Sequence, residues 1–120
     1  MEGKNQFHTR LKQIIHEYVR LVYKITKEFP KDELYGMTSQ LRRSALSVML
    51  NYIEGFARRR PAAMLNFFEI AYGSLKESKY LVYLAHEEEY IRKEVNYKRA
   101  ITLAEEIGAM LWSTIEGIGK

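Results

Sequence analysis

The chain contains no cysteine and only two prolines among its 120 residues. The lack of cysteine excludes disulfides, thiolate catalysis and zinc or iron–sulfur sites that use cysteine ligands. Hydrophobic residues make up 47% of the chain, which argues against disorder. No apolar run approaches the roughly 20 residues that cross a bilayer, and the first residues lack the apolar core of a signal peptide. We therefore expect a single cytoplasmic domain over residues 1–120, with no membrane partner.

Motifs that carry catalysis or metal binding are also missing. The sequence has three histidines: His8, His16 and His86. They are too scattered to form a local metal or acid–base motif, and no glycine-rich phosphate loop, HExxH or nucleophile elbow is present. Glu54 can be imagined to pair with Glu69 or Glu77, as carboxylates do in di-iron bundles, but the Glu-x-x-His motif of those sites does not occur. We expect a protein that is not an enzyme and that has no metal and no cofactor.

What the sequence does have is helical periodicity. Apolar residues recur at spacings of three and four, and no stretch alternates with period two. We expect four helices, at approximately residues 6–29, 39–58, 61–86 and 92–118. Pro30 ends the first, because proline disfavours helical geometry in the preceding residue, and Pro61 suits the first turn of the third. The short connections imply an all-α fold, an antiparallel up-down-up-down four-helix bundle.

The second predicted helix is more apolar than a lone surface helix. Gly36 breaks the chain before it, and Thr38 or Ser39 is the expected cap. Its apolar arc spans close to half of the cylinder, so we expect it to contact two neighbours, or one neighbour and another subunit. In the middle of the third helix, Gly73 costs about 1 kcal/mol relative to alanine. A close helix crossing is the expected compensation.

Charge is distributed unevenly along the chain. The formal net charge is +4, yet residues 1–60 hold 12 Lys or Arg against 6 Asp or Glu, whereas residues 61–120 hold 7 against 9. A basic half favours an anionic partner such as nucleic acid, although +4 alone is ordinary for a small domain. The best candidate contacts are Arg58, Arg59 and Arg60, because guanidinium groups bind phosphate through paired hydrogen bonds. The triplet would also complement the negative end of the helix dipole.

A polar line runs along one side of the second predicted helix. Its members are Arg43, Ser47, Asn51, Glu54 and Arg58. As a solvated face it would hold an ordinary i, i+4 pair of Glu54 with Arg58, whereas as a subunit interface it would bury groups that need partners. Small residues favour close approach, so we predict an oligomer interface at Ser47, Asn51, Glu54 and Gly55. Arg42 lies inside the apolar arc and is expected to reach past the bundle end or to pair with Asp32 or Glu33.

The same segment carries a family resemblance. Residues 40–58 read QLRRSALSVMLNYIEGFAR, in which QLRR, Ser47-Val48, Asn51 and Glu54-Gly55 have the spacing of the 23S rRNA intervening-sequence (S23-type) family of four-helix-bundle proteins. The flanks ELYGMT at residues 33–38 and GSLKE at residues 73–77 are similar as well, so the resemblance covers the chain from roughly residue 23 to residue 118. Met49-Leu50 stands where the family has Pro-Ser, and Tyr52-Ile53 where it has Ile-Ala.

This resemblance implies an assembly protein. Related bundles form ring-shaped homopentamers with a basic central funnel, and one branch serves diversity-generating retroelements by binding the reverse transcriptase and nucleic acid. Five copies of this chain would carry five times +4, or +20. We therefore expect a homo-oligomer, a pentamer as in the related bundles, that binds RNA or DNA phosphates. The expected contacts are Arg42, Arg43, Arg58, Arg59, Arg60, Lys24 and Lys27. The alternative is a protein–protein adaptor, such as a reverse-transcriptase accessory subunit.

Overall fold

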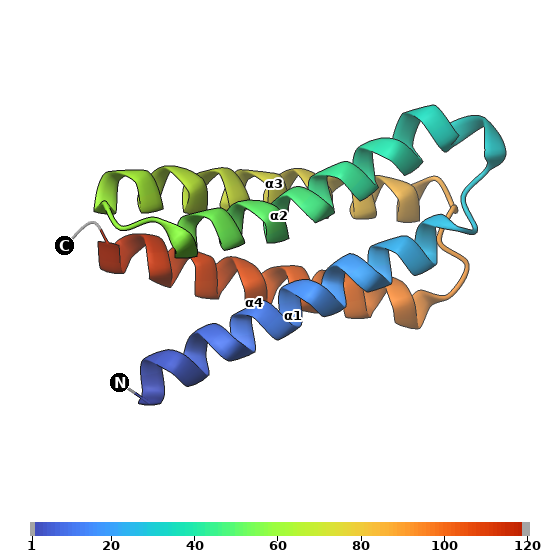
Figure 1. Ribbon diagram of the computed structural model, residues 1–120. Helices are drawn as coiled ribbons and strands as arrows, with labels where there is room; N and C mark the ends of the chain where they lie inside the picture. The colour runs from blue at the N-terminus through green and yellow to red at the C-terminus, as the bar shows by residue number, and fades with distance from the viewer. Residues whose placement is uncertain (1, 119–120) are drawn as a thin grey trace.

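A computed structural model describes residues 2–118 as a bundle of four helices that run antiparallel to their neighbours in the chain (Figure 1). The helices are α1 (Glu2–Thr26), α2 (Ser39–Ala57), α3 (Pro61–Glu87) and α4 (Glu94–Ile118). Two short helical turns, η1 (Lys31–Glu33) and η2 (Leu34–Thr38), join α1 to α2. The described residues include no strand, and the bundle measures 44 × 25 × 17 Å. The expected all-α four-helix bundle is confirmed.

The predicted helix limits agree with the structure to within a few residues. The largest misses lie at the two ends of α1, which begins at Glu2 and ends at Thr26, where limits of 6 and 29 were expected. At its end the chain tightens, because the N–H groups of Glu28 and Phe29 donate to the carbonyls three residues before them at 3.2 Å. Of the predicted domain, residues 1, 119 and 120 lie outside the described residues. Along residues 2–118 no helix combines the length and apolarity that a bilayer crossing requires.

The connection from α1 to α2 differs from the predicted capping. Thr38 is itself helical and its side chain makes no capping hydrogen bond. Instead, the carboxylate of Glu33 accepts a hydrogen bond from the N–H of Met37 at 3.2 Å and another from the hydroxyl of Tyr90 at 3.0 Å. Within η2 the backbone is non-helical at Gly36 (φ −109°, ψ −110°), the residue at which the sequence predicted a break. A carboxylate from the preceding turn thus replaces the predicted Thr or Ser cap.

The apolar stripes of the four helices meet in one core. The largest fully buried side chains are Tyr18, Phe68, Leu11, Ile14, Ile15, Ile25, Leu41, Leu75, Leu103, Ile107, Leu111 and Val22. Tyr18 is the one with a polar tip, and its hydroxyl lies 2.8 Å from Oγ of Ser78 on α3. Burial raises the pKa of Tyr18 to about 12, so it stays a neutral phenol that can both donate and accept. The core is therefore apolar with one satisfied polar pair across it.

The helices α2 and α3 pack closely because of a glycine. A Cβ placed on Gly55 would lie 2.7 Å from Cε1 of Phe68, so no other residue fits at this crossing without displacing the ring. Gly73 behaves differently. A Cβ there would meet nothing within 4 Å, so the close crossing predicted at Gly73 is wrong and the one in the structure is at Gly55.

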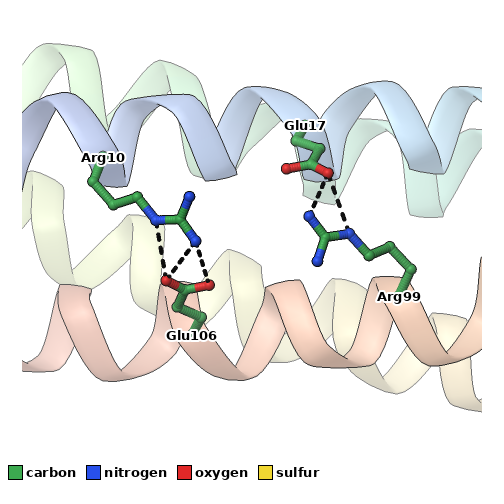
Figure 2. Close-up of polar contacts among 4 residues, drawn as sticks. All are labelled: Arg10, Glu17, Arg99 and Glu106. Carbon is green, nitrogen blue, oxygen red and sulfur yellow. Dashed lines mark hydrogen bonds and ion pairs between the residues drawn. The ribbon is translucent and has the colours of Figure 1, made fainter.

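Two ion pairs join α1 to α4 (Figure 2). Arg10 on α1 donates to both carboxylate oxygens of Glu106 on α4, at 2.9 to 3.2 Å. Two helical turns further along α1 the charges are reversed, and Arg99 on α4 donates to Glu17. This alternation fits antiparallel helices in one register, although such exposed pairs each contribute only about 0.2–1 kcal/mol.

Candidate nucleic-acid interface

The outward face of α1 carries a row of cations. Lys12, Arg20 and Lys24 are exposed there and Lys27 directly after the end of the helix, and within residues 2–118 none of the four forms an ion pair. They differ in this from the two α1–α4 pairs, whose arginines are neutralised by glutamates. We call these four residues the basic ridge. At 1.5 Å of rise per residue the ridge is about 22 Å long.

The basic ridge ends beside the first turn of α2. There, Nε of Arg42 donates to Oγ1 of Thr26 at 2.8 Å, and its guanidinium lies over the ring of Tyr23, 5.0 Å from the centroid. The predicted pairing of Arg42 with Asp32 or Glu33 is wrong, because Thr26 and Tyr23 of α1 hold the guanidinium in place. Arg43 is exposed on the neighbouring part of α2. Lys24, Lys27, Arg42 and Arg43 thus lie at one end of the bundle.

The arginine triplet lies at the other end of α2. Arg58 pairs with Glu54 one turn earlier, and its guanidinium lies over the ring of Phe67 at 5.3 Å. Arg59 and Arg60 are exposed in the connection to α3, and Arg60 has the extended backbone that precedes the first turn of a helix. From Arg42 to Arg59 the separation along the helix is about 25 Å. The predicted phosphate contacts therefore form two groups at opposite ends of α2.

Most of the predicted oligomer interface makes contacts inside one chain. Oγ of Ser47 lies 2.8 Å from Oγ of Ser74 on α3, and Nδ2 of Asn51 donates to both the carbonyl and the hydroxyl oxygen of Ser47 at 2.9 Å. Gly55 is buried against Phe68 of the same chain. Glu54 is exposed and pairs with Arg58. The polar line thus faces α3 along much of its length, and a role in subunit contacts stays a prediction.

An apolar stripe remains uncovered on α2 next to the polar line. Its members are Leu46, Leu50 and Ile53, with exposed fractions of 37%, 51% and 44%. They recur at spacings of three and four, so they lie along one face of the helix. The wide apolar arc of this helix accordingly divides into a part that packs on α1 and α3 and a part that faces outward. We call these three residues the apolar stripe.

A cluster of aromatic rings joins the start of α1 to the end of α2, and sequence reasoning missed it. Nδ1 of His8 lies 2.8 Å from the hydroxyl of Tyr52, while the ring of Phe56 meets the imidazole edge-on at 5.0 Å. Burial raises the pKa of Tyr52 to about 12, and burial together with the charge of Lys4 lowers the pKa of His8. Tyr52 belongs to the predicted apolar arc, but no sequence signal links it to a histidine 44 residues away.

The carboxylates and histidines of the described residues do not form a candidate metal site. No group of three or more side chains of the types His, Cys, Asp and Glu has the arrangement needed to hold a metal ion among these residues. His86 lies against the ring of Tyr97, with centroids 3.7 Å apart, and Nε2 is 2.8 Å from a carboxylate oxygen of Glu94. This histidine thus has a local structural partner at the start of α4.

Known proteins are similar to this chain in sequence pattern and in fold. A family model described as "23S rRNA-intervening sequence protein" matches residues 8–113. The fold is similar to the crystal structure of a protein with unknown function from the S23 ribosomal protein family of Bacteroides thetaiotaomicron, with a TM-score of 0.82 and 23% sequence identity. That likeness covers 92% of this chain and 98% of the other. No curated protein matches the chain.

Proposed function

Because the chain belongs to the 23S rRNA-intervening sequence protein family, we propose that it is a non-enzymatic, homo-oligomeric protein that binds RNA or DNA through phosphate contacts. The observation that carries the proposal is the basic ridge of Lys12, Arg20, Lys24 and Lys27, whose members form no ion pair within residues 2–118. Cations without carboxylate partners can neutralise phosphates, which releases the counterions that are condensed on the nucleic acid. Arg42 and Arg43 extend this surface onto α2.

Binding of this kind does not read base sequence. The ridge presents flexible ammonium and guanidinium groups on the outside of a helix, and such groups position a nucleic acid by its backbone. Arg42 is the exception to that flexibility, because Thr26 and Tyr23 hold its guanidinium. A fixed, planar guanidinium suits paired hydrogen bonds to one phosphate. We therefore expect Arg42 to contribute more affinity per charge than the ridge lysines.

Self-association would multiply the charge of this surface. The apolar stripe of Leu46, Leu50 and Ile53 is exposed, and contiguous exposed apolar surface is typical of protein contacts. A second copy seated on the stripe would cover it and would bring two basic sides into one assembly. A pentamer of the 14.2 kDa chain would weigh about 71 kDa and would carry a formal charge of +20.

The binding proposal is tested by charge reversal at both basic groups. One variant combines Lys24→Glu with Lys27→Glu, and another combines Arg59→Glu with Arg60→Glu. The matched control combines Lys93→Glu with Lys98→Glu, two exposed cations on the α3–α4 side. Each variant is titrated with a structured RNA and with a duplex DNA of equal length at salt concentrations between about 50 and 200 mM.

We expect the wild-type affinity for nucleic acid to fall steeply with salt, because each phosphate contact contributes about −0.9 to the logarithmic slope on duplex DNA. Each double reversal at a contact group should reduce the magnitude of that slope by about two, while the α4 control leaves it unchanged. Affinity that does not depend on salt, or an equal loss in the control, would contradict the proposal.

The oligomer is tested separately by light scattering. Leu50→Glu places a charge on the apolar stripe, and Ile70→Glu places the same charge on an equally exposed aliphatic position of α3. We expect wild type and Ile70→Glu to have the same mass, near 71 kDa for a pentamer, and Leu50→Glu to approach 14.2 kDa. A wild-type mass of one chain would refute self-association.

A protein–protein adaptor is the second candidate function, and the apolar stripe is the observation that favours it. In that case the stripe would bind a different protein, such as a reverse transcriptase, and the basic side would only support the complex. The two functions separate under the same substitutions. An adaptor loses its partner with Leu50→Glu and keeps it with Lys24→Glu/Lys27→Glu, as measured by co-purification with the candidate partner.

A further inference from the structure

A cleft opens at the end of the bundle where α1 begins. Figure 1 shows α1 diverging from the other three helices toward its N-terminal end. The first residue of α1 that is fully buried is Leu11, more than two turns from the start, whereas Phe7 is only half-buried. A hydrogen bond between His8 and Tyr52 joins α1 to α2 beside the cleft. The result is a space of about 560 Å³ between the first turns of α1 and the ends of the other helices.

The walls of this cleft are largely apolar. They are formed by Phe7, Phe56, Met64, Phe68 and Ile118. A second cleft of about 350 Å³ continues on the other side of His8 and Phe56, against Ile53 and Tyr52. Both volumes fall in the range of small-molecule sites, which are mostly apolar with a few placed polar groups.

The polar groups of the cleft are positively charged or neutral. Lys4 and His8 stand one turn apart on α1 at its edge, and no Asp or Glu lines either cleft among the side chains that the structure describes, residues 3–118. Nδ1 of His8 is occupied by Tyr52, which leaves Nε2 as the imidazole atom available to a ligand. Oγ1 of Thr114 donates to the carbonyl of Met110 at 2.9 Å and needs no further acceptor. The cationic donor at the edge of the cleft is therefore the ammonium of Lys4, and Nε2 of His8 donates in the tautomer that carries its proton there.

We propose that this cleft binds an amphipathic anion, with its aliphatic chain or ring against Phe7, Phe56 and Met64 and its acidic head group on Lys4 and Nε2 of His8. An apolar body would cover side chains that the divergence of α1 leaves open to water. An anionic head group would meet the ammonium of Lys4, together with Nε2–H of His8 in the tautomer that places the proton there, and no carboxylate of the described side chains lines the site. It would also offset the charge of Lys4, which disfavours protonation of His8 in the unliganded protein.

The probes are decanoate and 1-decanol, each added below its aggregation limit and measured by calorimetry on the full chain at pH 7. They share the apolar tail and differ in charge. We expect decanoate to bind with one molecule per chain and 1-decanol to bind at least about tenfold more weakly, because a charge-assisted hydrogen bond contributes more than a neutral one. Equal affinities for the two probes, or no binding of either, would overturn the proposal.

Matched variants locate the site. Lys4→Glu should weaken decanoate binding at least about tenfold, whereas Lys98→Glu, an exposed lysine at the opposite end of the bundle, should leave it unchanged. Ser113→Trp fills the cleft from an exposed position of α4, and Thr102→Trp adds the same bulk elsewhere on that helix. Loss of binding in Ser113→Trp but not in Thr102→Trp supports the site. Equal effects within either pair refute it.

The same chemistry occurs free in solution and at a membrane surface, and vesicles distinguish the two sources. Vesicles of phosphatidylglycerol are compared with vesicles of phosphatidylcholine in a sedimentation assay. Binding to the anionic vesicles that Lys4→Glu removes would assign a lipid surface, whereas binding of decanoate alone would assign a free acid. If Lys4→Glu changes neither the binding to anionic vesicles nor the binding of decanoate, the proposal fails, whatever the variant does to nucleic-acid binding.

Discussion

The α2–α3 seam and the α1–α4 seam hold the bundle together by different means. In the first, small residues allow the backbones to approach, with Gly55 against Phe68 and the hydroxyls of Ser47 and Ser74 sharing a hydrogen bond. In the second, two exposed ion pairs lie over the core (Figure 2). Close packing has almost no tolerance for added atoms, whereas exposed ion pairs are weak and replaceable. The α2–α3 seam is thus the one with the close backbone approach, whereas α1 packs through its buried apolar stripe and adds exposed ion pairs to α4.

This difference explains where the candidate functions lie. The basic ridge and the cleft both belong to α1, which diverges at its start and has its outer face free of ion pairs within residues 2–118. The α2–α3 hairpin instead presents the apolar stripe on a fixed support. Surfaces that must fit a protein partner gain from rigidity, because less conformational entropy is lost on binding. Phosphate contacts made through long flexible side chains require less rigidity of the backbone.

The largest expected effect follows from adding one methyl group to the α2–α3 seam. Gly55→Ala would place a Cβ 2.7 Å from Cε1 and 2.8 Å from Cδ1 of the buried Phe68 ring. Overpacking of this kind costs about 1–3 kcal/mol, which exceeds the gain of up to about 1 kcal/mol in helix propensity. We expect a net loss of free energy of unfolding, measured by urea denaturation. An unchanged or raised stability would mean that the seam is not tightly packed.

The second prediction concerns the same hairpin, but here the free energy of unfolding should rise. Gly73→Ala adds the same methyl group where nothing lies within 4 Å, so only the helix propensity changes. We expect the free energy of unfolding to rise by about 0.5–1 kcal/mol. A loss in this variant would indicate that the outer face of α3 is covered in solution, for example by a second copy, and the loss should then disappear in dilute protein.

The two glycines also show what the sequence could predict. Periodicity identifies the buried face of α3, whose Phe68, Leu75 and Val82 all lie in the core. It places Gly55 and Gly73 on helices, but the side from which the neighbouring helix approaches depends on how the whole bundle assembles. The sequence therefore predicted a close crossing at Gly73, where there is none, and did not predict the crossing of Gly55 with Phe68. The predicted subunit contact at Gly55 stays a prediction.

The candidate site was predictable in composition but less so in arrangement. The cations of the basic half follow directly from counting charges, and the unusual angle of Arg42 was visible from its position in the apolar arc. Its partners were not, since Thr26 and Tyr23 lie on another helix and the pairing depends on a contact between helices. The same reason hid the pairing of His8 with Tyr52.

The third prediction concerns the ion pairs of the α1–α4 seam. A double-mutant cycle with Arg10→Ala and Glu106→Ala should give a coupling free energy of about 0.2–1 kcal/mol, because both side chains are exposed and water screens them. The coupling should shrink between low salt and about 1 M salt, where the Debye length falls to about 3 Å. A coupling above about 2 kcal/mol would contradict the view that these exposed pairs contribute little to the attachment of α1.

The smallest expected effect concerns His8, which joins the start of α1 to α2. Burial and the charge of Lys4 lower the pKa of this histidine in the folded state below its ordinary value of 6.5. Between the folded-state pKa and 6.5 the unfolded chain binds more protons than the folded protein. The free energy of unfolding is therefore highest above pH 6.5 and falls as the pH is lowered from 6.5 to the folded-state pKa. The imidazole is only partly buried and solvent screens its interactions, so we expect this loss to be the smallest of the four effects.

His8→Gln removes the titrating group while keeping a side chain that can bond to Tyr52, and His16→Gln, at an exposed position of the same helix, is the control. Urea denaturation at pH 7.5 and pH 5.5 should show a smaller difference in unfolding free energy for His8→Gln than for wild type or His16→Gln. If the difference between the two pH values is instead smaller in His16→Gln than in His8→Gln, the acid sensitivity belongs to His16 and not to His8.

Lys4 and His8 also border the cleft. Bound decanoate should therefore reduce the loss of unfolding free energy at low pH in wild type, because an anion beside His8 favours its protonated form in the folded state.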